Sequence, residues 1–401
     1  MLSELFYPHG SGGELATYLY AELLRKAGIN VVVVTNRFSG EPEVSRSENL
    51  IVYRLPLLNE TRGVKYSILR RFDVLISGFM KKLMKWADVV YIPKFWYSAI
   101  PFAKIYGKPV IVHLHGYTPV CPLSTLYDAS NDATCTCKNG FCSLRCIYNN
   151  ERNHGESLFQ TLTSVVLNST VGYCFGEYIK LSDAVICVSK AQSDFVKRLD
   201  ATLHYKIHVI YNPLPKLSYM NVEGDDFGYF GGLSYLKGFH VLRKSMVYVN
   251  RISHKQIHVH ATKFPNLDKR IIESFNQLGI SVYKKLSNSE YNDLYKRLRA
   301  VIVPSIWNEP LPYVITEAIL RGRIVIASQI GGIPEQVEGC KGAFLFKAGD
   351  YKELANTIEY LSGFGRDTVN DFGLHDRRVL LKRYGRRKAL QELIRVCESI
   401  V

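Results

Sequence analysis

Short apolar runs alternate with helix-length segments along most of this chain of 401 residues. In the first half, the apolar runs are residues 31–35, 89–92, 109–114, 184–188 and 207–210. Runs of this length, rich in Val and Ile, are typical of strands buried on both faces of a parallel sheet. The segments 14–27 and 64–86 are long enough for helices between the strands, and Gly28 ends the first of them.

The second half repeats this alternation. Its expected strands are residues 227–231, 256–260, 280–283, 300–304, 323–327 and 343–346. Its expected helices are residues 238–250, 268–278, 289–298, 312–321 and 350–362. Strands that alternate with helices predict an α/β protein whose parallel, doubly wound sheets carry helices on both faces.

A break in the pattern separates the two halves. Residues 211–226 are rich in Pro, Asn and acidic side chains, as expected for a linker. The sequence therefore predicts an N-terminal Rossmann-like domain at 1–212, a linker at 213–226 and a second domain at 227–375. Residues 376–401 are expected to form a helical tail that packs back toward the N-terminal domain. Two such domains normally bind a ligand in the cleft between the carboxyl ends of their strands.

The net charge of the chain indicates which kinds of ligand or surface it can bind. Lys and Arg number 51 against 36 Asp and Glu, so the formal net charge is +15. This excess fits a phosphate-bearing ligand, an anionic membrane surface or a nucleic acid. The cations are spread over both halves and no nucleic-acid motif is present, so a nucleic-acid partner is not expected.

The ends of the chain and its apolar runs predict where the protein resides. There is no basic head followed by an apolar leader, and no apolar run long enough to span a bilayer, so we expect a cytoplasmic protein. Residues 1–6 leave little room for a first strand before the loop 8–13, and Glu4 is unusual in a buried strand. We therefore expect a shortened first strand whose natural start lies upstream of Met1, with a genuine start at Met1 as the alternative.

The most informative segment is 304–337. A strand ends there, a loop carries Glu309, and a helix follows with Pro312 in its first turn and Glu317 in its second. The backbone N–H groups at a helix start favour an anion such as a diphosphate, and the two carboxylates can accept hydrogen bonds from sugar hydroxyls. By itself, a pair of Glu residues separated by seven positions is usually a solvated helix face.

The whole ordered segment resembles the donor-binding half of GT-B-fold retaining glycosyltransferases of family 4. It runs from the strand through Glu309-Pro310 and Glu317-Ala318 to Gly322 and the motif at 331–335. Weaker similarities follow in the family's order at residues 229–238, 182–189, 209–213 and 6–14. The resemblance implies a GT-B fold, in which two Rossmann-like doubly wound domains face a central cleft.

The resemblance also implies roles for particular residues. Lys237 would neutralise the donor diphosphate, Glu309 would bind the transferred sugar, and His115 would lie beside that sugar. His113 competes for the last role, since it alternates with His115 on a strand, and one of the two is expected to be a core histidine. The implied donor-binding residues are Gly12, Gly13, Gly232, Lys237, Leu311, Pro312, Tyr313 and Glu317.

One position departs from the family pattern. Gly232 stands five residues before Lys237, where the family usually has an Arg that provides a second cation for the diphosphate. Either Lys237 acts with the helix N-terminus alone, or another residue substitutes for the Arg. Lys263, just past the strand at 256–260, is our candidate; a solvated loop lysine is the alternative.

The implied reaction transfers a sugar from a nucleotide-diphosphate sugar to an acceptor hydroxyl with retention, and needs no catalytic metal. No carboxylate pair suited to Mg²⁺ is visible, and we expect Asp225 and Asp226 to be solvated in the linker. The alternatives are a GT-B-fold sugar-nucleotide epimerase or phosphorylase, and a non-catalytic basic protein that binds membranes or nucleic acid.

Five cysteines lie within 26 residues, in an irregular insertion at about 116–154. Cys135, Cys137, Cys142 and Cys146 are close enough to form a tetrahedral zinc site, with Cys121 as a spare. We expect a structural metal, while disulfides or free thiols are the equally weighted alternative.

Segment 62–86 is the candidate for membrane contact. It carries seven Lys or Arg and one Asp, interleaved with apolar residues at helical spacing. Such a helix can lie in a membrane interface, although the apolar stripe could equally be the buried face of a Rossmann-type helix. Since enzymes of the resembling family often dock on the cytoplasmic leaflet, an anionic membrane surface and an acceptor glycan or polyprenyl-linked sugar are the expected partners.

Overall fold

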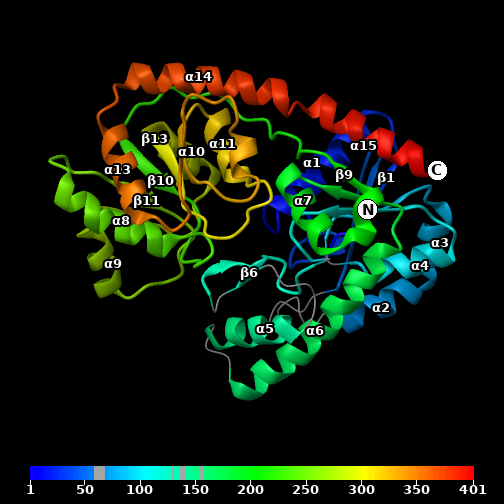
Figure 1. Ribbon diagram of the computed structural model, residues 1–401. Helices are drawn as coiled ribbons and strands as arrows, with labels where there is room; N and C mark the ends of the chain where they lie inside the picture. Colours follow the sequence, from blue (N-terminus) through cyan, green and yellow to red (C-terminus); the bar gives the residue numbers. More distant parts are fainter. Residues whose placement is uncertain (58–67, 95, 119, 129–130, 136–140, 154–156) are drawn as a thin grey trace. The chain divides into compact units, whose positions relative to one another are not determined.

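A computed structural model describes residues 1–57, 68–94, 96–118, 120–128, 131–135, 141–153 and 157–401 (Figure 1). The chain divides into two compact units, the first formed by Met1–Pro213 with Arg386–Val401 and the second by Leu214–Gly385. The expected boundary at 375 is wrong, because it falls inside helix α14 (Arg366–Arg383), which is continuous. The chain passes from the second unit to the first only between Gly385 and Arg386.

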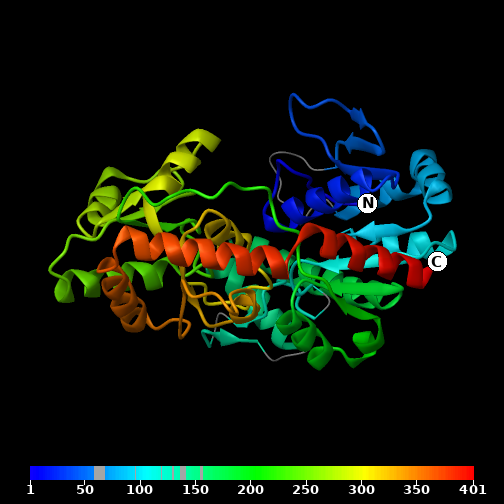
Figure 2. The same cartoon turned by 90° about the horizontal axis from the view of Figure 1, so that it is seen from above.

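The first unit is built on parallel strands. One sheet has the order β4-β5-β8-β9, formed by Val90–Ile92, Val110–Leu114, Ala184–Cys187 and Ile207–Val209. A second sheet has the order β1-β3-β2, formed by Val31–Asn36, Leu50–Leu55 and Val44–Ser47, with β2 antiparallel to β3. Figure 2 shows the β2–β3 pair at the edge of this unit. Leu2 and Ser3 connect the sheets through isolated parallel bridges to Val34 and Lys94, so the first strand is as short as its sequence indicates.

The helices of the first unit are α1 (Gly12–Lys26), α2 (Ile68–Ile76), α3 (Gly78–Trp86), α4 (Ala99–Ile105), α5 (Phe141–Asn153), α6 (Leu158–Lys180), α7 (Lys190–Leu199) and α15 (Arg386–Ile400). A 3₁₀ helix (Ala201–Lys206) and a small antiparallel pair, β6 (Tyr127–Asp128) and β7 (Ala133–Thr134), complete it. α15 packs against α1, and its Leu393 and Val396 join the core of the N-terminal sheets. The expected single helix at 64–86 is wrong: Ser77 starts a second helix there by accepting a hydrogen bond from the Met80 N–H.

The second unit contains one sheet of parallel strands in the order β12-β11-β10-β13-β14-β15. These strands are Ile280–Val282, Val259–Ala261, Asp226–Tyr229, Leu298–Val303, Ile324–Ser328 and Ala343–Phe346. Besides α14, its helices are α8 (Phe239–Ile252), α9 (Lys269–Asn276), α10 (Asn288–Arg297), α11 (Tyr313–Leu320), α12 (Ile333–Gln336) and α13 (Tyr351–Ser362). Numbered along the chain, the strands have the order 3-2-1-4-5-6, whose direction reverses between β10 and β13. In such sheets, ligands bind outside the carboxyl ends of the strands at this switch point.

Asp225 and Asp226 belong to the folded second unit rather than to a linker. The Asp225 side chain is nevertheless 60% exposed, so the expectation of a solvated carboxylate is wrong only for Asp226. Asp226 begins β10 and pairs with His260 at 2.9 Å and Arg297 at 3.1 Å. Asp225 pairs with the buried guanidinium of Arg299 at 2.5 Å. These cations lower the pKa of both carboxyl groups although partial burial opposes the change. Both carboxylates are therefore engaged in structural ion pairs.

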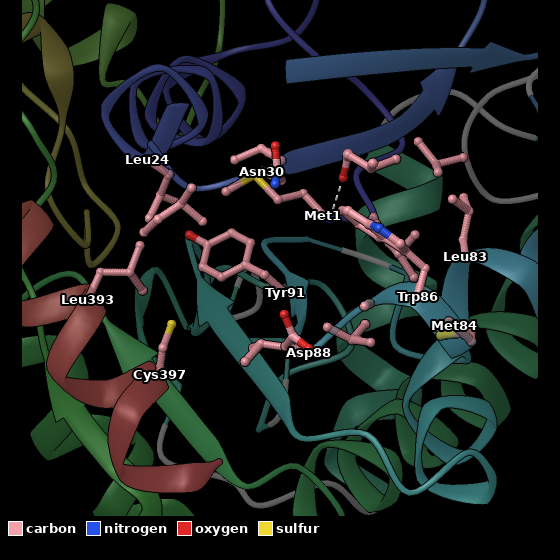
Figure 3. Close-up of a pocket in the computed structure, with 18 of the residues that line it drawn as sticks. Met1, Leu24, Asn30, Leu83, Met84, Trp86, Asp88, Tyr91, Leu393 and Cys397 are labelled. Carbon is pink, nitrogen blue, oxygen red and sulfur yellow. Dashed lines mark hydrogen bonds between the residues drawn. The ribbon is translucent and has the colours of Figure 1, made fainter. Parts of the chain in front are cut away.

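A cavity of about 610 Å³ lies in the first unit at the amino ends of β1 and β4 (Figure 3). Its lining is mostly apolar and comes from α1, α3, α15 and the starts of the two strands, including Leu24, Met84 and Leu393. The Met1 amino group beside it donates a hydrogen bond to the Val32 carbonyl at 2.7 Å, and burial lowers the pKa of this amine to about 5. Ligands of parallel sheets bind at the carboxyl ends, so this cavity is separate from the candidate site.

Across the described part of the chain, no helix is both long enough and apolar enough to cross a bilayer.

Candidate active site

In the second unit, the loops that follow β10 and β13 meet at the switch point of the sheet. Gly238 begins α8 with φ of +75°, and a Cβ atom at this position would lie 1.7 Å from the Pro304 carbonyl oxygen. The Ile306 N–H donates to the Leu236 carbonyl at 3.0 Å. Only glycine allows so close an approach of the two loops, which holds Lys237 beside the segment that carries Glu309.

Lys237 and Glu309 form the centre of this site. Lys237 Nζ lies 2.5 Å from Glu309 Oε1, the same oxygen that accepts hydrogen bonds from Ser305 Oγ at 2.8 Å and Trp307 Nε1 at 3.0 Å. The Lys237 ammonium also lies 5.3 Å from the centre of the Trp307 ring, within reach of a cation–π interaction. The carboxylate is buried, whereas the lysine side chain is 40% exposed. The arrangement thus fixes the carboxylate firmly and leaves the cation accessible to an anionic ligand.

A second glycine loop, which follows β14, contacts the backbone of Glu309. Gly331 has φ of +58°, and a Cβ atom there would lie 2.4 Å from the Glu309 carbonyl oxygen. The Gly332 N–H donates to that oxygen at 2.8 Å. The Gly-Gly pair that follows β14 therefore fixes the backbone at Glu309, which explains this part of the sequence pattern structurally.

Glu317 lies on α11, just past the end of β13. Pro312 is the N-cap of this helix rather than a residue of its first turn, and helical geometry begins at Tyr313. The first turn of an α-helix leaves backbone N–H groups without intrahelical partners, and these can bind a phosphate. Burial raises the pKa of Glu317, an effect that Arg321 and Lys263 oppose. Tyr291 OH donates to Glu317 Oε2 at 3.4 Å.

The structure brings Lys263 beside Gly232. Gly232 has φ of +61°, its N–H donates to Thr262 O at 3.2 Å, and a Cβ atom there would lie 2.7 Å from the Lys263 carbonyl oxygen. Lys263 itself has φ of +69°, which is uncommon for a residue with a side chain. Its side chain is exposed, and its charge favours ionisation of Glu317. This loop contact excludes a side chain at position 232 and places the exposed Lys263 at the neighbouring strand end.

In the first unit, Gly13 and His115 are neighbours. Gly12 and Gly13 are the first two residues of α1, and a Cβ atom at Gly13 would lie 3.1 Å from the His115 Cβ. His115 follows β5, whereas His113 lies within it, and their rings stack with centroids 4.7 Å apart. The two rings therefore face the same way, as their alternation on a strand predicts.

The two histidines differ in their partners. His113 is fully buried and its Nδ1 is 2.5 Å from Tyr91 OH, as expected for a core histidine. His115 Nε2 is buried and has no hydrogen-bond partner among the described residues. Burial lowers the pKa of His113 well below its usual range and that of His115 to about 4, so both rings are neutral at pH 7. The Nε2 of His113 is likewise buried without a partner among the described residues, so the two rings differ in the Tyr91 contact of His113 and in the position of His115 next to the α1 glycines.

A buried ion pair lies beside His115. Lys94 Nζ is 2.8 Å from Glu14 Oε1, and the Ser11 N–H and hydroxyl donate to Glu14 Oε2 at 2.7 and 3.0 Å. Burial would raise the pKa of Glu14, but Lys94 and the hydrogen bonds from Ser11 outweigh it and lower this pKa. Glu14 thus ties the glycine loop at the start of α1 to the residue that follows β4.

The low pKa of His115 predicts a pH effect on stability. The unfolded chain takes up a proton on this ring below about pH 6.5, whereas the folded chain does so only near pH 4, so stability falls as the pH drops between these values. We expect His115→Gln to remove about 2 kcal/mol of the loss in unfolding free energy between pH 7 and pH 5. Urea unfolding at the two pH values measures it, and an unchanged difference would contradict the assignment.

Two residues beside the candidate residues of the second unit and two beside those of the first unit were not predicted from the sequence. Ser305 and Trp307 lie in the same loop as Glu309, and their side chains orient its carboxylate. Glu14 and Lys94 form their ion pair across 80 positions of the chain. Glu14 directly follows the two glycines, so its position could have been noticed in the sequence. No local sequence pattern distinguishes Lys94.

The cysteine cluster falls only partly within the described residues. Cys137 and the side chain of Cys142 lie outside them. Cys135 follows β7, and Cys146 lies on α5 with its Sγ 3.9 Å from Asp128 Oδ1. Within the residues that the structure places, no three His, Cys, Asp or Glu side chains form a group suited to a metal ion.

Comparison with known proteins agrees with this architecture. Residues 10–215 match Glycosyltransferase Family 4, and residues 220–363 match Glycosyl transferases group 1. A Klebsiella pneumoniae relative, described as an uncharacterized 42.6 kDa protein in the cps region, is 22% identical over 350 residues, 84% of this chain and 86% of its own.

Solved structures with the same fold cover nearly the whole chain. Anabaena Alr3699/HepE in complex with UDP and glucose has a TM-score of 0.64 at 17% identity, covering 99% of this chain and 98% of its own. Sucrose-phosphate synthase from Thermosynechococcus elongatus has a TM-score of 0.69 at 13% identity, covering 99% and 97%.

The two doubly wound units and these similarities define the fold as that of the GT-B glycosyltransferases. Within that class, the chain belongs to Glycosyltransferase Family 4, whose match spans residues 10–215. It is therefore a glycosyltransferase with the fold and family that its motifs predict.

Proposed function

We propose that this enzyme transfers a sugar from a nucleotide-diphosphate sugar to an acceptor hydroxyl with retention of configuration at the anomeric carbon. The observation that carries the proposal is the Lys237–Glu309 pair at the switch point of the second sheet, next to the start of α11. An accessible ammonium and the start of a helix suit a diphosphate, and a carboxylate held by three donors suits sugar hydroxyls.

In the proposed reaction, the bond between the anomeric carbon and the donor phosphate oxygen breaks, and the acceptor oxygen forms the new bond on the same face. The acceptor proton passes to an oxygen of the leaving diphosphate. Negative charge therefore develops on that diphosphate, where Lys237 and the start of α11 stabilise it. Leu311, Pro312 and Tyr313 would line the phosphates, and Glu317 would hold the ribose. In the first unit, Gly12 and Gly13 would let α1 approach the diphosphate and the acceptor, and His115 would lie beside the transferred sugar.

In the proposed mechanism, cationic side chains of the second unit, rather than a catalytic metal ion, balance the negative charge of the diphosphate. We propose that Lys263 provides the second cation for the diphosphate, in place of the Arg that the family usually has at the position of Gly232. The support is the contact between Gly232 and the Lys263 backbone, together with the effect of the Lys263 charge on Glu317.

We expect Lys263→Ala to weaken nucleotide-sugar binding about tenfold, because one cation near the diphosphate contributes about 1.4 kcal/mol. Lys263→Arg should restore most of the affinity. The exposed neighbour Lys285 provides the matched control, since Lys285→Ala removes the same charge from a nearby loop. Calorimetric titration with the donor measures these affinities; equal binding by Lys263→Ala and Lys285→Ala would contradict the role of Lys263.

We further propose an acceptor glycan or polyprenyl-linked sugar presented at an anionic membrane surface on the cytoplasmic side. In segment 62–86, the apolar stripe is divided: Leu75, Met80 and Met84 are buried, as the core-facing interpretation requires, whereas Phe72, Ile76 and Trp86 are exposed. Lys81, Lys82 and Lys85 are exposed and remain the candidates for lipid headgroups. Arg62 and Lys65, and the side chains of Arg70 and Arg71, lie outside the described residues.

A structural zinc at Cys135, Cys137, Cys142 and Cys146 also remains a proposal. The thiolate set has the chemistry of a zinc site, and it would fix the insertion between β5 and α6.

A panel of UDP-, GDP- and ADP-sugars tests the proposed function, starting with UDP-glucose because Alr3699/HepE was solved with UDP-glucose. We expect one donor to be consumed and NMR of the product to show retained configuration. An epimerised free sugar nucleotide would favour the epimerase alternative. Neither binding nor turnover of any donor would contradict the proposed function and leave the non-catalytic basic protein.

A further inference from the structure

Helix α6 is long and nearly free of charge. It spans 23 residues from Leu158 to Lys180, and its first 19 residues contain no Asp, Glu, Lys or Arg. Ser157 caps it by accepting a hydrogen bond from the Gln160 N–H at 3.3 Å. In Figure 1, α5 and α6 lie side by side, with β6 next to α5.

The exposed face of α6 is more apolar than its buried face. The buried face consists of Thr161, Ser164, Gly172, Phe175, Gly176 and Ile179. The opposite face presents Phe159, Leu162, Val166 and Tyr173, three, four and seven positions apart, with exposed fractions of 80, 52, 64 and 60%. A surface helix of a water-soluble protein normally has the reverse distribution. A contiguous stripe of this kind marks an interaction surface.

The polar side chains within the stripe need no water to satisfy their hydroxyl donors. Thr163 Oγ1 donates to the Phe159 carbonyl at 2.7 Å, and Thr170 Oγ1 donates to the Val166 carbonyl at 2.8 Å. Hydroxyl groups that bond to the preceding helical turn in this way are tolerated in an apolar environment, where an unpaired donor would be costly.

Exposed cations and further apolar side chains lie on the part of the first unit that continues from α4 to the end of α3. α4 packs against α6 and ends at Ile105, which is 80% exposed. Beyond it, Lys108 Nζ donates to the Lys85 carbonyl at 3.2 Å, which links this region to the end of α3 and the exposed Trp86. Lys81, Lys82 and Lys85 on α3 are all exposed. An apolar helix face on a unit that also exposes lysines and a Trp is typical of a protein that enters the headgroup region of a bilayer.

We propose that the face of α6 formed by Phe159, Leu162, Val166 and Tyr173 inserts into an anionic lipid surface, with the α3 lysines at the headgroups. A second copy of the chain is disfavoured as the occupant, because each copy carries +15 and would repel another. The inference deepens the membrane association proposed above and rests on it. It assigns the inserting element to α6 rather than to segment 62–86.

Co-sedimentation of the full chain with vesicles of phosphatidylglycerol and phosphatidylcholine tests this inference. We expect Val166→Glu to weaken vesicle binding about tenfold, since it replaces an inserted side chain worth roughly 1.5–3 kcal/mol of burial by a charge. Gln160→Glu is the matched control: it adds the same charge to an exposed position outside the stripe and should bind nearly as the wild type does.

The salt concentration distinguishes the electrostatic contribution of the lysines from the apolar contribution of α6. At 0.5 M NaCl the lysine contribution is screened, so the remaining binding should depend on Val166 and not on a Lys81→Glu/Lys82→Glu variant. Equal loss in Val166→Glu and Gln160→Glu, no loss in either, or no vesicle binding by the wild type would overturn the role of α6. A dimer that Val166→Glu converts to a monomer would overturn it in favour of a second copy. Donor binding, measured separately, reports on the proposed function itself.

Discussion

Glu309→Gln and Lys237→Met are each expected to lower the rate of sugar transfer by about 100- to 1,000-fold, the range that follows loss of one preorganised electrostatic partner. Lys237 is the accessible cation beside the start of α11, and the Glu309 carboxylate is the acceptor held by Ser305 and Trp307. Steady-state kinetics with the donor found in the panel would measure both variants.

Both variants should remain folded. The Lys237 side chain is 40% exposed, and an ion pair with such a partner contributes at most about 1 kcal/mol to stability. In Glu309→Gln the amide oxygen can still accept the hydrogen bonds from Ser305 and Trp307. Normal circular dichroism and unfolding midpoints within a few degrees of the wild type serve as the control. Near-normal turnover in either variant would remove that residue from the proposed mechanism.

Gly238→Ala is expected to destabilise the second unit by more than about 4 kcal/mol, at the exceptional end of single substitutions. The left-handed backbone at Gly238 costs an alanine about 1–2 kcal/mol. The larger part comes from the Pro304 carbonyl oxygen, which lies 1.7 Å from the position of the new Cβ atom. If the loop moves to relieve this overlap, Lys237 moves with it, so the folded fraction should also lose activity. Urea unfolding of the full chain measures the effect.

Gly349 supplies the matched control for this prediction. It also has a positive φ, +84°, but a Cβ atom there would meet nothing within 4 Å. Gly349→Ala should therefore cost only the backbone term of about 1–2 kcal/mol and leave transfer unchanged. Similar unfolding free energies for the two variants would show that the contact between the β10 and β13 loops is not tight.

Much of the candidate site in the second unit could be predicted from local patterns in the sequence. Glu309 follows a strand and Glu317 lies in the second turn of the next helix, at spacings that the chain fixes within a few residues, so both positions could be inferred directly. The position of Lys237 was implied by the resemblance to the glycosyltransferase family. His113 and His115 also face the same way because side chains on a strand alternate. Which of the two is a core histidine depended on Tyr91, whose partnership with His113 forms between strands.

At two helical segments, the exposed surface depends on which face of the helix packs inward, and periodicity alone does not decide that. The stripe in 62–86 has the spacing of an interfacial helix, yet Leu75, Met80 and Met84 are buried. α6 contains Thr, Ser and Gly at helical spacing, and packing turned that side inward and left Phe159 and Val166 outside. A helical repeat identifies two faces, but only neighbouring elements select the buried one.

The sequence by itself determined the alternation of strands and helices, the glycines at strand ends and the residues of the donor loop, because each depends on neighbours within one strand–loop–helix unit. Tertiary structure decided what those residues touch. It placed Pro304 against Gly238, Lys94 on Glu14 and the Lys263 backbone against Gly232. These contacts join strands that are distant in the chain, so they follow from the order and register of the sheets and leave no local signal.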